Sequence, residues 1–220
     1  MQMDQEEITP VKRQADPISN WKILWAKSNP RHPLWKHMLD VAAVSMALPI
    51  LENSFGWKSL EIAFLAGLHD IGKADSVFQH QIPDFSTELT DNGYQKTGDV
   101  RCRHECISAR FINKRLIAEG IDGYAADSIS RAVAAHHGYW DEVARDVGEQ
   151  YRKAQDRLYA MLQQVLSIVA LPATNPSDLS AFGMRLAGHV VLCDWIASNE
   201  QFFGDFRLNA IEDSQVSMTA

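Results

Sequence analysis

The chain has 220 residues, of which 46% are hydrophobic and 22% charged, a balance that is typical of a folded domain and excludes general disorder. Lys and Arg number 21 against 28 Asp and Glu, and the net charge of −7 excludes a protein that holds nucleic acid by basic charge alone. It does not exclude an enzyme that acts on nucleic acids, because bound divalent cations add positive charge that this sum omits.

Three cysteines favour a reducing, cytoplasmic location over a disulfide framework. No apolar run approaches the ~20 residues of a membrane span, so we expect no membrane contact.

Apolar residues at helical spacing predict a helix from about Pro33 to Glu52. A second, strongly apolar helix is expected from about Lys58 to Ile71 and should be central in the fold. Gly72 follows it in the position of a helix-ending glycine. We expect the whole chain to divide into a flexible leader at 1–20, one domain at 21–205 and a C-terminal tail at 206–220.

Residues 83–101 are rich in Pro, Gly, Asp, Asn and Thr, and they predict a long loop. Four further helices are expected, at about 104–119, 123–137, 141–170 and 177–199. Strand signals are weak throughout. The sequence therefore predicts an all-α helical bundle in which the ends of several helices meet at a common site.

Histidines and carboxylates recur on or beside these predicted helices. The candidate metal ligands are His37, His69, Asp70, His104, His136, His137 and Asp194. Imidazole and carboxylate groups suit first-row divalent metals such as Mn, Fe, Co, Ni and Zn. A hydrolase with two metal ions needs roughly six to eight protein ligands, including one bridging carboxylate. This set has the required number and mixture.

The His69–Asp70 doublet is the most informative part of the set. Neighbouring residues on a helix point ~100° apart, so both side chains can reach one site only across a helix end or between helices. Asp70 has two oxygens and can contact two metal ions. His136 and His137 also stand at a predicted helix end. Asp194 lies in an apolar run, where a buried carboxylate is costly unless it is paired or binds metal.

Each signal has a structural alternative when it is taken singly. A lone His-Asp doublet also arises by chance, and the pair at 136–137 would be favoured by the dipole at a helix C-terminus. Lys73 is interpreted as a catalytic cation for a phosphate oxygen or leaving group, although a solvated helix end also favours lysine. Asp40 lies three residues after His37 and would either orient it or remain a solvated charge.

Three histidines are left out of the predicted site. His32 and His80 are interpreted as surface or loop residues. His189 lies five residues before Asp194, off the face that carries this carboxylate. The joint pattern of the remaining residues, rather than any single motif, indicates metal binding.

The order H…HD…H…HH…D resembles the HD superfamily of metal-dependent phosphohydrolases. More narrowly, the chain from about Trp21 to Phe203 resembles the HD nuclease domain of type I CRISPR interference nuclease–helicases. The matching segments are LWAKS, PLWKHMLDVAAV, GLHDIGKADSVFQ, RHECISA, AAHHG and LCDWIASNEQFF. The full set is specific, whereas each segment alone is not.

This resemblance implies an all-α HD-domain fold and a two-metal site that cuts single-stranded DNA. Carried over by motif, one metal ion would take His37, His69, Asp70 and Asp194, and the other would take Asp70, His104, His136 and His137. Asp70 would bridge the two ions and, with Lys73, is the expected catalytic pair. The ions would be Mn, Fe, Co or Ni.

The resemblance also implies partners. Most family members join the HD domain to an ATP-driven helicase, but this chain has no G-x-x-x-x-G-K-[ST] phosphate-binding loop. We therefore expect the helicase to be a separate chain or a missing part. Together they would act on the DNA strand that an RNA-guided CRISPR surveillance complex displaces.

Two alternative functions stay open at this point. One is an HD-type phosphodiesterase or phosphohydrolase that acts on a cyclic dinucleotide or a nucleotide. The absence of a GYP tripeptide after the histidine pair weighs against a cyclic dinucleotide, and a mononucleotide enzyme would leave His104, His136 and His137 unexplained. The other is a non-catalytic module that binds a protein partner.

Overall fold

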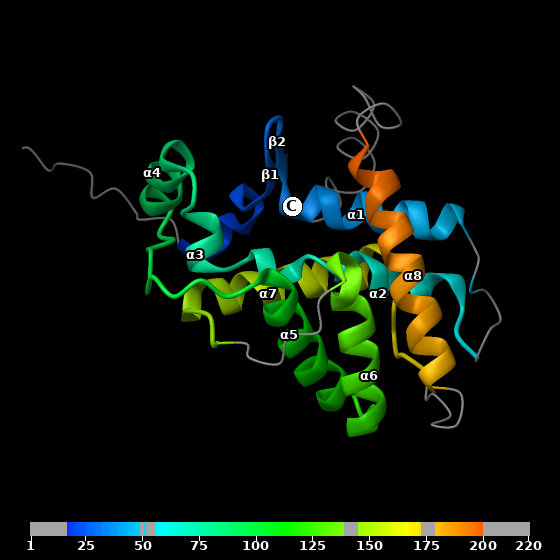
Figure 1. Ribbon diagram of the computed structural model, residues 1–220. Coiled ribbons are helices and arrows are strands. Elements are labelled where there is room, and N and C mark those ends of the chain that lie inside the picture. The colour runs from blue at the N-terminus through cyan, green and yellow to red at the C-terminus, as the bar shows by residue number, and fades with distance from the viewer. Residues whose placement is uncertain (1–16, 49–50, 52–55, 139–144, 173–178, 200–220) are drawn as a thin grey trace, which may run out of the picture.

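The computed structural model describes residues 17–48, 51, 56–138, 145–172 and 179–199 (Figure 1). Within them the α-helices are α1 (Leu34–Ala47), α2 (Ser59–Gly67), α3 (Ser76–Gln79), α4 (Pro83–Asp91), α5 (His104–Ala118), α6 (Gly123–Ala134), α7 (Glu149–Val165) and α8 (Leu179–Ser198). The 3-10 helices are η1 (Pro17–Ile23), η2 (Ile71–Lys73) and η3 (Ala135–His137). Strands β1 (Trp25–Ser28) and β2 (Arg31–Pro33) form a short antiparallel hairpin. Residues 1–16 of the predicted leader and the whole predicted tail lie outside the described residues.

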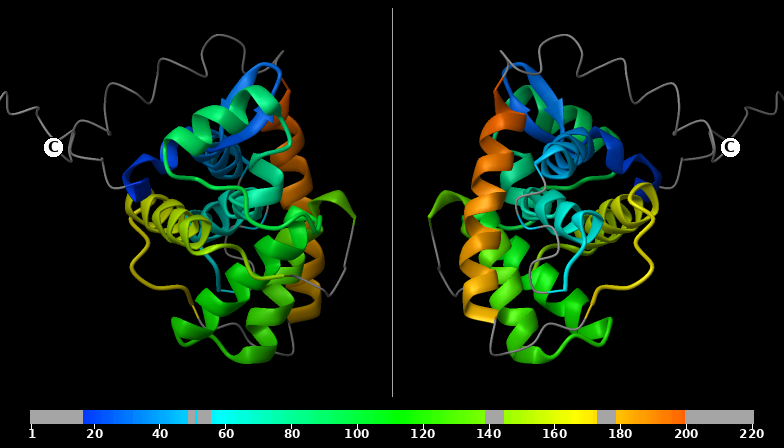
Figure 2. Two further views of the ribbon diagram at one scale, coloured as in Figure 1. Left: turned by 90° about the vertical axis from the view of Figure 1, so that its left-hand side faces the viewer. Right: turned by 90° about the vertical axis from the view of Figure 1, so that its right-hand side faces the viewer.

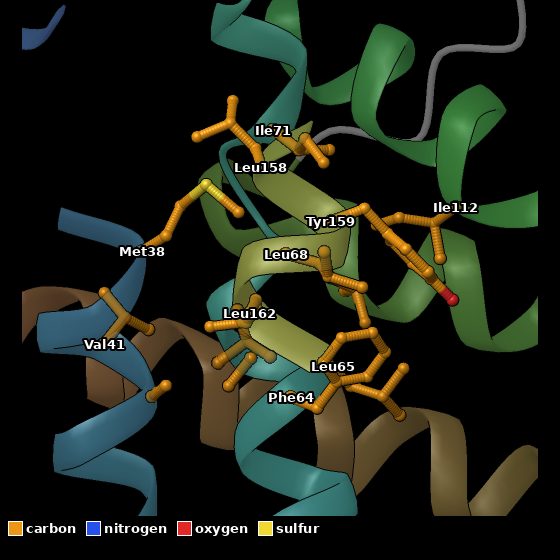
Figure 3. Packing of buried hydrophobic residues seen from close by; sticks show 14 of the residues in the cluster. Met38, Val41, Phe64, Leu65, Leu68, Ile71, Ile112, Leu158, Tyr159 and Leu162 are labelled. Atoms are coloured by element: carbon orange, nitrogen blue, oxygen red, sulfur yellow. The ribbon is translucent and has the colours of Figure 1, made fainter. Parts of the chain in front are cut away.

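Helix α2 is the centre of the hydrophobic core, as its sequence predicts. Its residues from Ile62 to Gly67 are all buried, because the helix is apolar around its full circumference and so must be covered on every side. Helices α1 and α7 cover it, as Figure 3 shows. The packing is tight at Gly67, where an added Cβ would lie 2.8 Å from the Leu162 side chain and 3.0 Å from the Met38 carbonyl oxygen.

The remaining helices bring several helix ends to one place. Helices α5 and α6 pack against each other, and α8 packs against both α6 and α1 (Figures 1 and 2). The segment after α2, with η2, packs against α5, while η3 at the end of α6 packs against α8. The predicted all-α fold with converging helix ends is therefore confirmed.

Helix α2 ends earlier than predicted, and Gly72 has a different role from the expected helix cap. The helix stops at Gly67, and the chain turns before the short helix η2. A Cβ on Gly72 would lie 2.0 Å from the His104 carbonyl oxygen and 2.6 Å from the Ser108 backbone nitrogen. The Gly72 N–H donates to Ser108 Oγ at 2.8 Å. Glycine is therefore required here because the turn lies directly on α5.

Other local predictions were also wrong. The predicted loop at 83–101 contains α4, which begins with Pro83 at its first position, where a proline is well tolerated. Strands β1 and β2 have only four and three residues, too few to give a clear alternating pattern. Helix α1 ends at Ala47, and α7 extends from Glu149 to Val165, so among the described residues the helix predicted over 141–170 is shorter than expected. Residues 141–144 of that prediction lie outside the described part of the chain.

The predicted helices at 104–119, 123–137 and 177–199 are confirmed to within about two residues by α5, by α6 with η3, and by α8. Among the described residues, no helix combines the length and the apolar character needed to cross a membrane.

Candidate metal centre

Asp70 lies at the centre of the site, in the turn between α2 and η2, and is 1% exposed. Its Oδ2 atom lies 3.1 Å from Nε2 of His37 and 3.3 Å from Nε2 of His69. Its Oδ1 atom lies 3.1 Å from Nε2 of His104 and 3.4 Å from Nε2 of His136. The two oxygens of one carboxylate therefore face two different pairs of histidines.

Asp194 of α8 completes the first group. Its Oδ1 atom lies 3.3 Å from Nε2 of His37 and 3.5 Å from Nε2 of His69. The Ser198 hydroxyl, one turn further along α8, donates to the same oxygen at 2.9 Å. We call this group of four residues set A: His37, His69, Asp70 through Oδ2, and Asp194.

The second group comes from the start of α5 and the end of α6. Ligand nitrogens of His104, His136 and His137 all lie within 4.8 Å of one another. His137 is exposed, so this side of the site opens to solvent. Gly138 follows with a φ of +72°, a left-handed conformation that ends the helix immediately after the histidine pair. We call these three histidines, with Oδ1 of Asp70, set B.

The site contains an unusual concentration of buried polar atoms that lack a hydrogen-bond partner. These atoms are Nδ1 and Nε2 of His37, Nε2 of His69, Oδ1 of Asp70, Nε2 of His104, and Nδ1 and Nε2 of His136. Buried nitrogen and oxygen atoms are nearly always paired in folded proteins. Most of these atoms point at one another across a short space, which is the arrangement that divalent cations would satisfy. The residues present therefore fit the metal ions that the sequence implies.

Two histidines are oriented by contacts on their other ring nitrogen. Nδ1 of His69 donates to the Ala66 carbonyl oxygen at 2.9 Å, which directs Nε2 toward set A. Nδ1 of His104 lies 3.2 Å from Oε2 of Glu105, a buried carboxylate that also accepts a hydrogen bond from Arg103 at 2.7 Å. Glu105 was missed from the sequence. Its position directly after a candidate ligand was the available signal.

The charges in set A compensate one another. Burial lowers the pKa of the His69 imidazole, but Asp70 and Asp194 outweigh burial and raise this pKa to about 9. Burial would raise the pKa of Asp70, but Lys73 and His69 hold it well below its usual range, and the neighbouring histidines do the same for Asp194. At neutral pH both carboxylates are therefore ionised, as metal ligands must be.

Set B has the opposite character. Burial lowers the pKa of His136 to about 4, although the nearby Asp70 carboxylate opposes this shift. The pKa of His137 is also lowered, by burial and by His104. These two imidazoles are thus neutral at pH 7, which leaves their lone pairs available for a metal ion.

Lys73 reaches into the site from η2. Its Nζ atom lies 2.6 Å from Oδ2 of Asp70 and 5.7 Å from the centre of the Phe78 ring. The lysine side chain is 12% exposed. The structure therefore brings Lys73 together with all seven predicted metal ligands.

The interpretation of His32 was wrong, because this residue is buried and its Nε2 lies 2.7 Å from Oδ2 of the buried Asp40. The burial of Asp40 excludes the solvated-charge alternative and leaves the other one, in which Asp40 orients His37. His189 does lie apart from both sets, as expected, with Nε2 2.8 Å from Ser45 Oγ. His80 is half-buried and contacts Ser86 and the Tyr94 carbonyl oxygen.

Comparison with known proteins identifies the family. The family described as "Cas3, HD domain" matches residues 25–203. The chain belongs to the Cas3 HD-domain family. The match covers every residue of sets A and B, and it confirms the resemblance that the sequence motifs carry.

Curated relatives in this family are much longer than the chain. It is 27% identical over 235 aligned positions to a CRISPR-associated endonuclease/helicase Cas3 of Thermus thermophilus, covering 89% of this chain and 25% of the relative. It is 25% identical to a CRISPR-associated nuclease/helicase Cas3 of Streptococcus thermophilus, covering 77% of this chain and 22% of the relative. The chain thus spans about a quarter of the length of these relatives.

Solved structures share the fold. A crystal structure titled as a CRISPR-associated protein is 31% identical, with a TM-score of 0.70 over 89% of this chain and 24% of that chain. The crystal structure of the Thermus thermophilus Cas3 HD domain in the presence of Ni2+ is 24% identical. Its TM-score is 0.61, over 85% of this chain and 80% of that one. The HD-domain architecture of the described residues is therefore that of solved Cas3 proteins.

Proposed function

We propose that this chain is a metal-dependent nuclease that hydrolyses phosphodiester bonds of single-stranded DNA in CRISPR interference. The observation that carries the proposal is the arrangement around Asp70, whose two oxygens face separate donor sets. A bridging carboxylate between two groups of nitrogen and oxygen ligands is the arrangement of a two-metal phosphodiester hydrolase.

In this proposal set A would hold one divalent ion and set B would hold the other, with Asp70 contributing one oxygen to each set. The mixture of imidazole and carboxylate favours Mn, Fe, Co or Ni. The crystal structure of a related HD domain in the presence of Ni2+ supports a transition metal. Bound ions of this kind neutralise phosphate charge and lower the pKa of a water molecule enough for attack at neutral pH.

The chain's own residues contribute positioning and charge. Asp70 is enclosed on all sides, so its carboxylate cannot turn away to solvent. Lys73 adds a positive charge beside Asp70 and would neutralise a phosphate oxygen or the departing oxygen of the DNA strand. The exposed His137 and the partly exposed His104 mark the side from which a strand would approach.

The names of the curated relatives support the proposed partners. The curated relatives are named as nuclease/helicases, whereas this chain has no phosphate-binding loop. We propose that an ATP-driven helicase, on a separate chain or on a part not present here, feeds single-stranded DNA to the site. The strand would be the one that an RNA-guided CRISPR surveillance complex displaces.

A cleavage assay with defined metals tests the proposal. The full chain is stripped with a chelator, and Mn2+, Co2+, Ni2+, Mg2+ or Zn2+ is added back singly. The substrates are circular single-stranded DNA, circular duplex DNA and a cyclic dinucleotide. Cutting of the circular single strand with a transition metal is expected, and it should be lost in Asp70→Ala while the circular dichroism spectrum persists.

The other outcomes are equally informative. Turnover of the cyclic dinucleotide alone would assign the chain to the signalling phosphodiesterases and overturn the proposed substrate. Absence of hydrolysis with every ion would favour a non-catalytic module.

A further inference from the structure

A second buried pair of histidine and aspartate lies beside set A. Nε2 of His32, on β2, lies 2.7 Å from Oδ2 of Asp40, on α1, and their side chains are 7% and 8% exposed. A buried carboxylate is costly unless it is paired, and His32 supplies the partner. Neither residue belongs to set A or set B, and the proposed mechanism does not use either of them.

This pair is in reach of a metal ligand. The ring centres of His32 and His37 are 6.1 Å apart. One ring nitrogen of His37 lies within 4.8 Å both of a His32 nitrogen and of an Asp40 oxygen. His37 and Asp40 are three residues apart on α1, so their side chains share a face of the helix. His37 thus has acidic groups within reach both in set A and in the His32–Asp40 pair.

One ring nitrogen of His37 lacks a hydrogen-bond acceptor. A histidine that binds a metal through one nitrogen usually donates its other N–H to a carboxylate, a carbonyl oxygen or water. His69 has the Ala66 carbonyl oxygen for this purpose, and His104 has Glu105. Nδ1 of His37 is buried without a hydrogen-bond partner. Asp40 is the acidic group on the same helix face that can meet this need.

We propose that Asp40 is a positioning residue for His37, and that His32 holds Asp40 in place. When Nε2 of His37 binds the metal ion of set A, the Asp40 carboxylate accepts the Nδ1–H and fixes the plane of the ring. The inference rests on the proposed metal centre, and it adds two residues that act through His37. It also gives the short hairpin a role, because β2 carries His32 to the back of α1.

The test is a calorimetric titration in which Mn2+ is added to the chelator-stripped full chain and its affinity is measured. The measurement uses a His104→Ala background, which removes a set B ligand and leaves set A as the intact site. In this background Asp40→Ala should weaken Mn2+ binding by about 10- to 100-fold, the usual effect of losing such a partner. His32→Ala should weaken it less. His32→Gln keeps an N–H donor for Asp40 and should restore most of the affinity.

His189→Gln is the matched control. His189 is also a buried histidine that joins two elements, through Ser45 of α1, but it lies apart from both sets. We expect this variant to change thermal stability without changing Mn2+ affinity. Asp40→Ala should instead show a clear loss of Mn2+ affinity, whatever its effect on thermal stability.

The outcomes separate this inference from the proposed function. Unchanged Mn2+ affinity in Asp40→Ala would overturn the positioning role and leave the metal centre intact. The Asp40→Ala substitution is also tested in the otherwise wild-type chain, where both sites can bind Mn2+. If it weakened binding at set A and at set B equally, Asp40 would have a general structural role, and the positioning role would also be overturned. Failure of the wild-type chain to bind Mn2+ at all would refute the metal centre itself. If Asp40→Ala does not fold, Asp40→Asn decides, with about a tenfold loss expected because an amide oxygen is a weaker acceptor than a carboxylate.

Discussion

The ammonium group of Lys73 lies 2.6 Å from Oδ2 of Asp70, the same carboxylate oxygen that His37 and His69 approach. Lysine and a metal ion in set A would therefore share one oxygen. We therefore propose that Lys73 balances charge at the metal centre and does not bind a metal ion, because an ammonium group cannot donate a lone pair to a metal.

Lys73→Met tests this assignment. We expect hydrolysis of a small phosphodiester to fall by about 10²- to 10³-fold, as when one charge-stabilising group is removed from an active site. Mn2+ affinity should stay the same or increase, since Oδ2 no longer shares its charge with an ammonium group. Turnover and calorimetric titration check both values. A loss of metal affinity parallel to the loss of activity would instead indicate that Lys73 only supports the ligands.

Metal binding should stabilise the fold, because it satisfies buried atoms that lack partners in sets A and B. With an ion at 100 times its dissociation constant, linkage predicts about 2.7 kcal/mol for each site. Thermal unfolding of the stripped protein should therefore shift upward with Mn2+ and return on addition of a chelator. Asp70→Ala should remove most of the shift. A shift of equal size in that variant would place the binding elsewhere.

Gly72→Ala should damage the site without replacing any of the candidate ligands. The new Cβ would lie 2.0 Å from the His104 carbonyl oxygen, so the turn that carries Asp70 must move away from α5. Overpacking of this kind costs about 1–3 kcal/mol, and urea denaturation measures the loss. Gly123→Ala is the control, because a Cβ there meets no atom within 4 Å. Equal stability of the two variants would contradict the close approach.

The buried His189 predicts a pH dependence of stability. Burial lowers its pKa in the folded chain below the ordinary value of about 6.5, so the unfolded chain binds the proton more tightly. Its contribution is therefore fully present above about pH 6.5 and is lost as the pH falls through the folded pKa. Urea denaturation from pH 7.5 to 5 should show a smaller decline in His189→Gln than in wild type. Parallel declines would mean that His189 titrates normally.

The residues of the candidate site could be predicted well because the ability to bind a metal depends on residue type, which the sequence gives directly. Imidazole and carboxylate groups at predicted helix ends indicated a metal site, so Asp70 and the six other candidate ligands were named from the sequence. The structure brings all seven together. The sequence could not predict from the residues alone that Oδ1 and Oδ2 of Asp70 face different histidines. This arrangement depends on how helices α1, α5, α6 and α8 converge.

In the fold, too, some features could be predicted from local sequence and others depend on tertiary contacts. Sequence patterns predicted the helices that became α5, α6 and α8, because helical signals are local. The earlier end of α2 and the placement of Gly72 against His104 depend on contact with α5, which no local pattern encodes. The burial of His32 with Asp40 is similar, since a two-stranded hairpin must first carry His32 to α1. The sequence thus predicted which side chains gather at the candidate metal centre, because residue type is local, and tertiary packing decided which atoms of those side chains face each other.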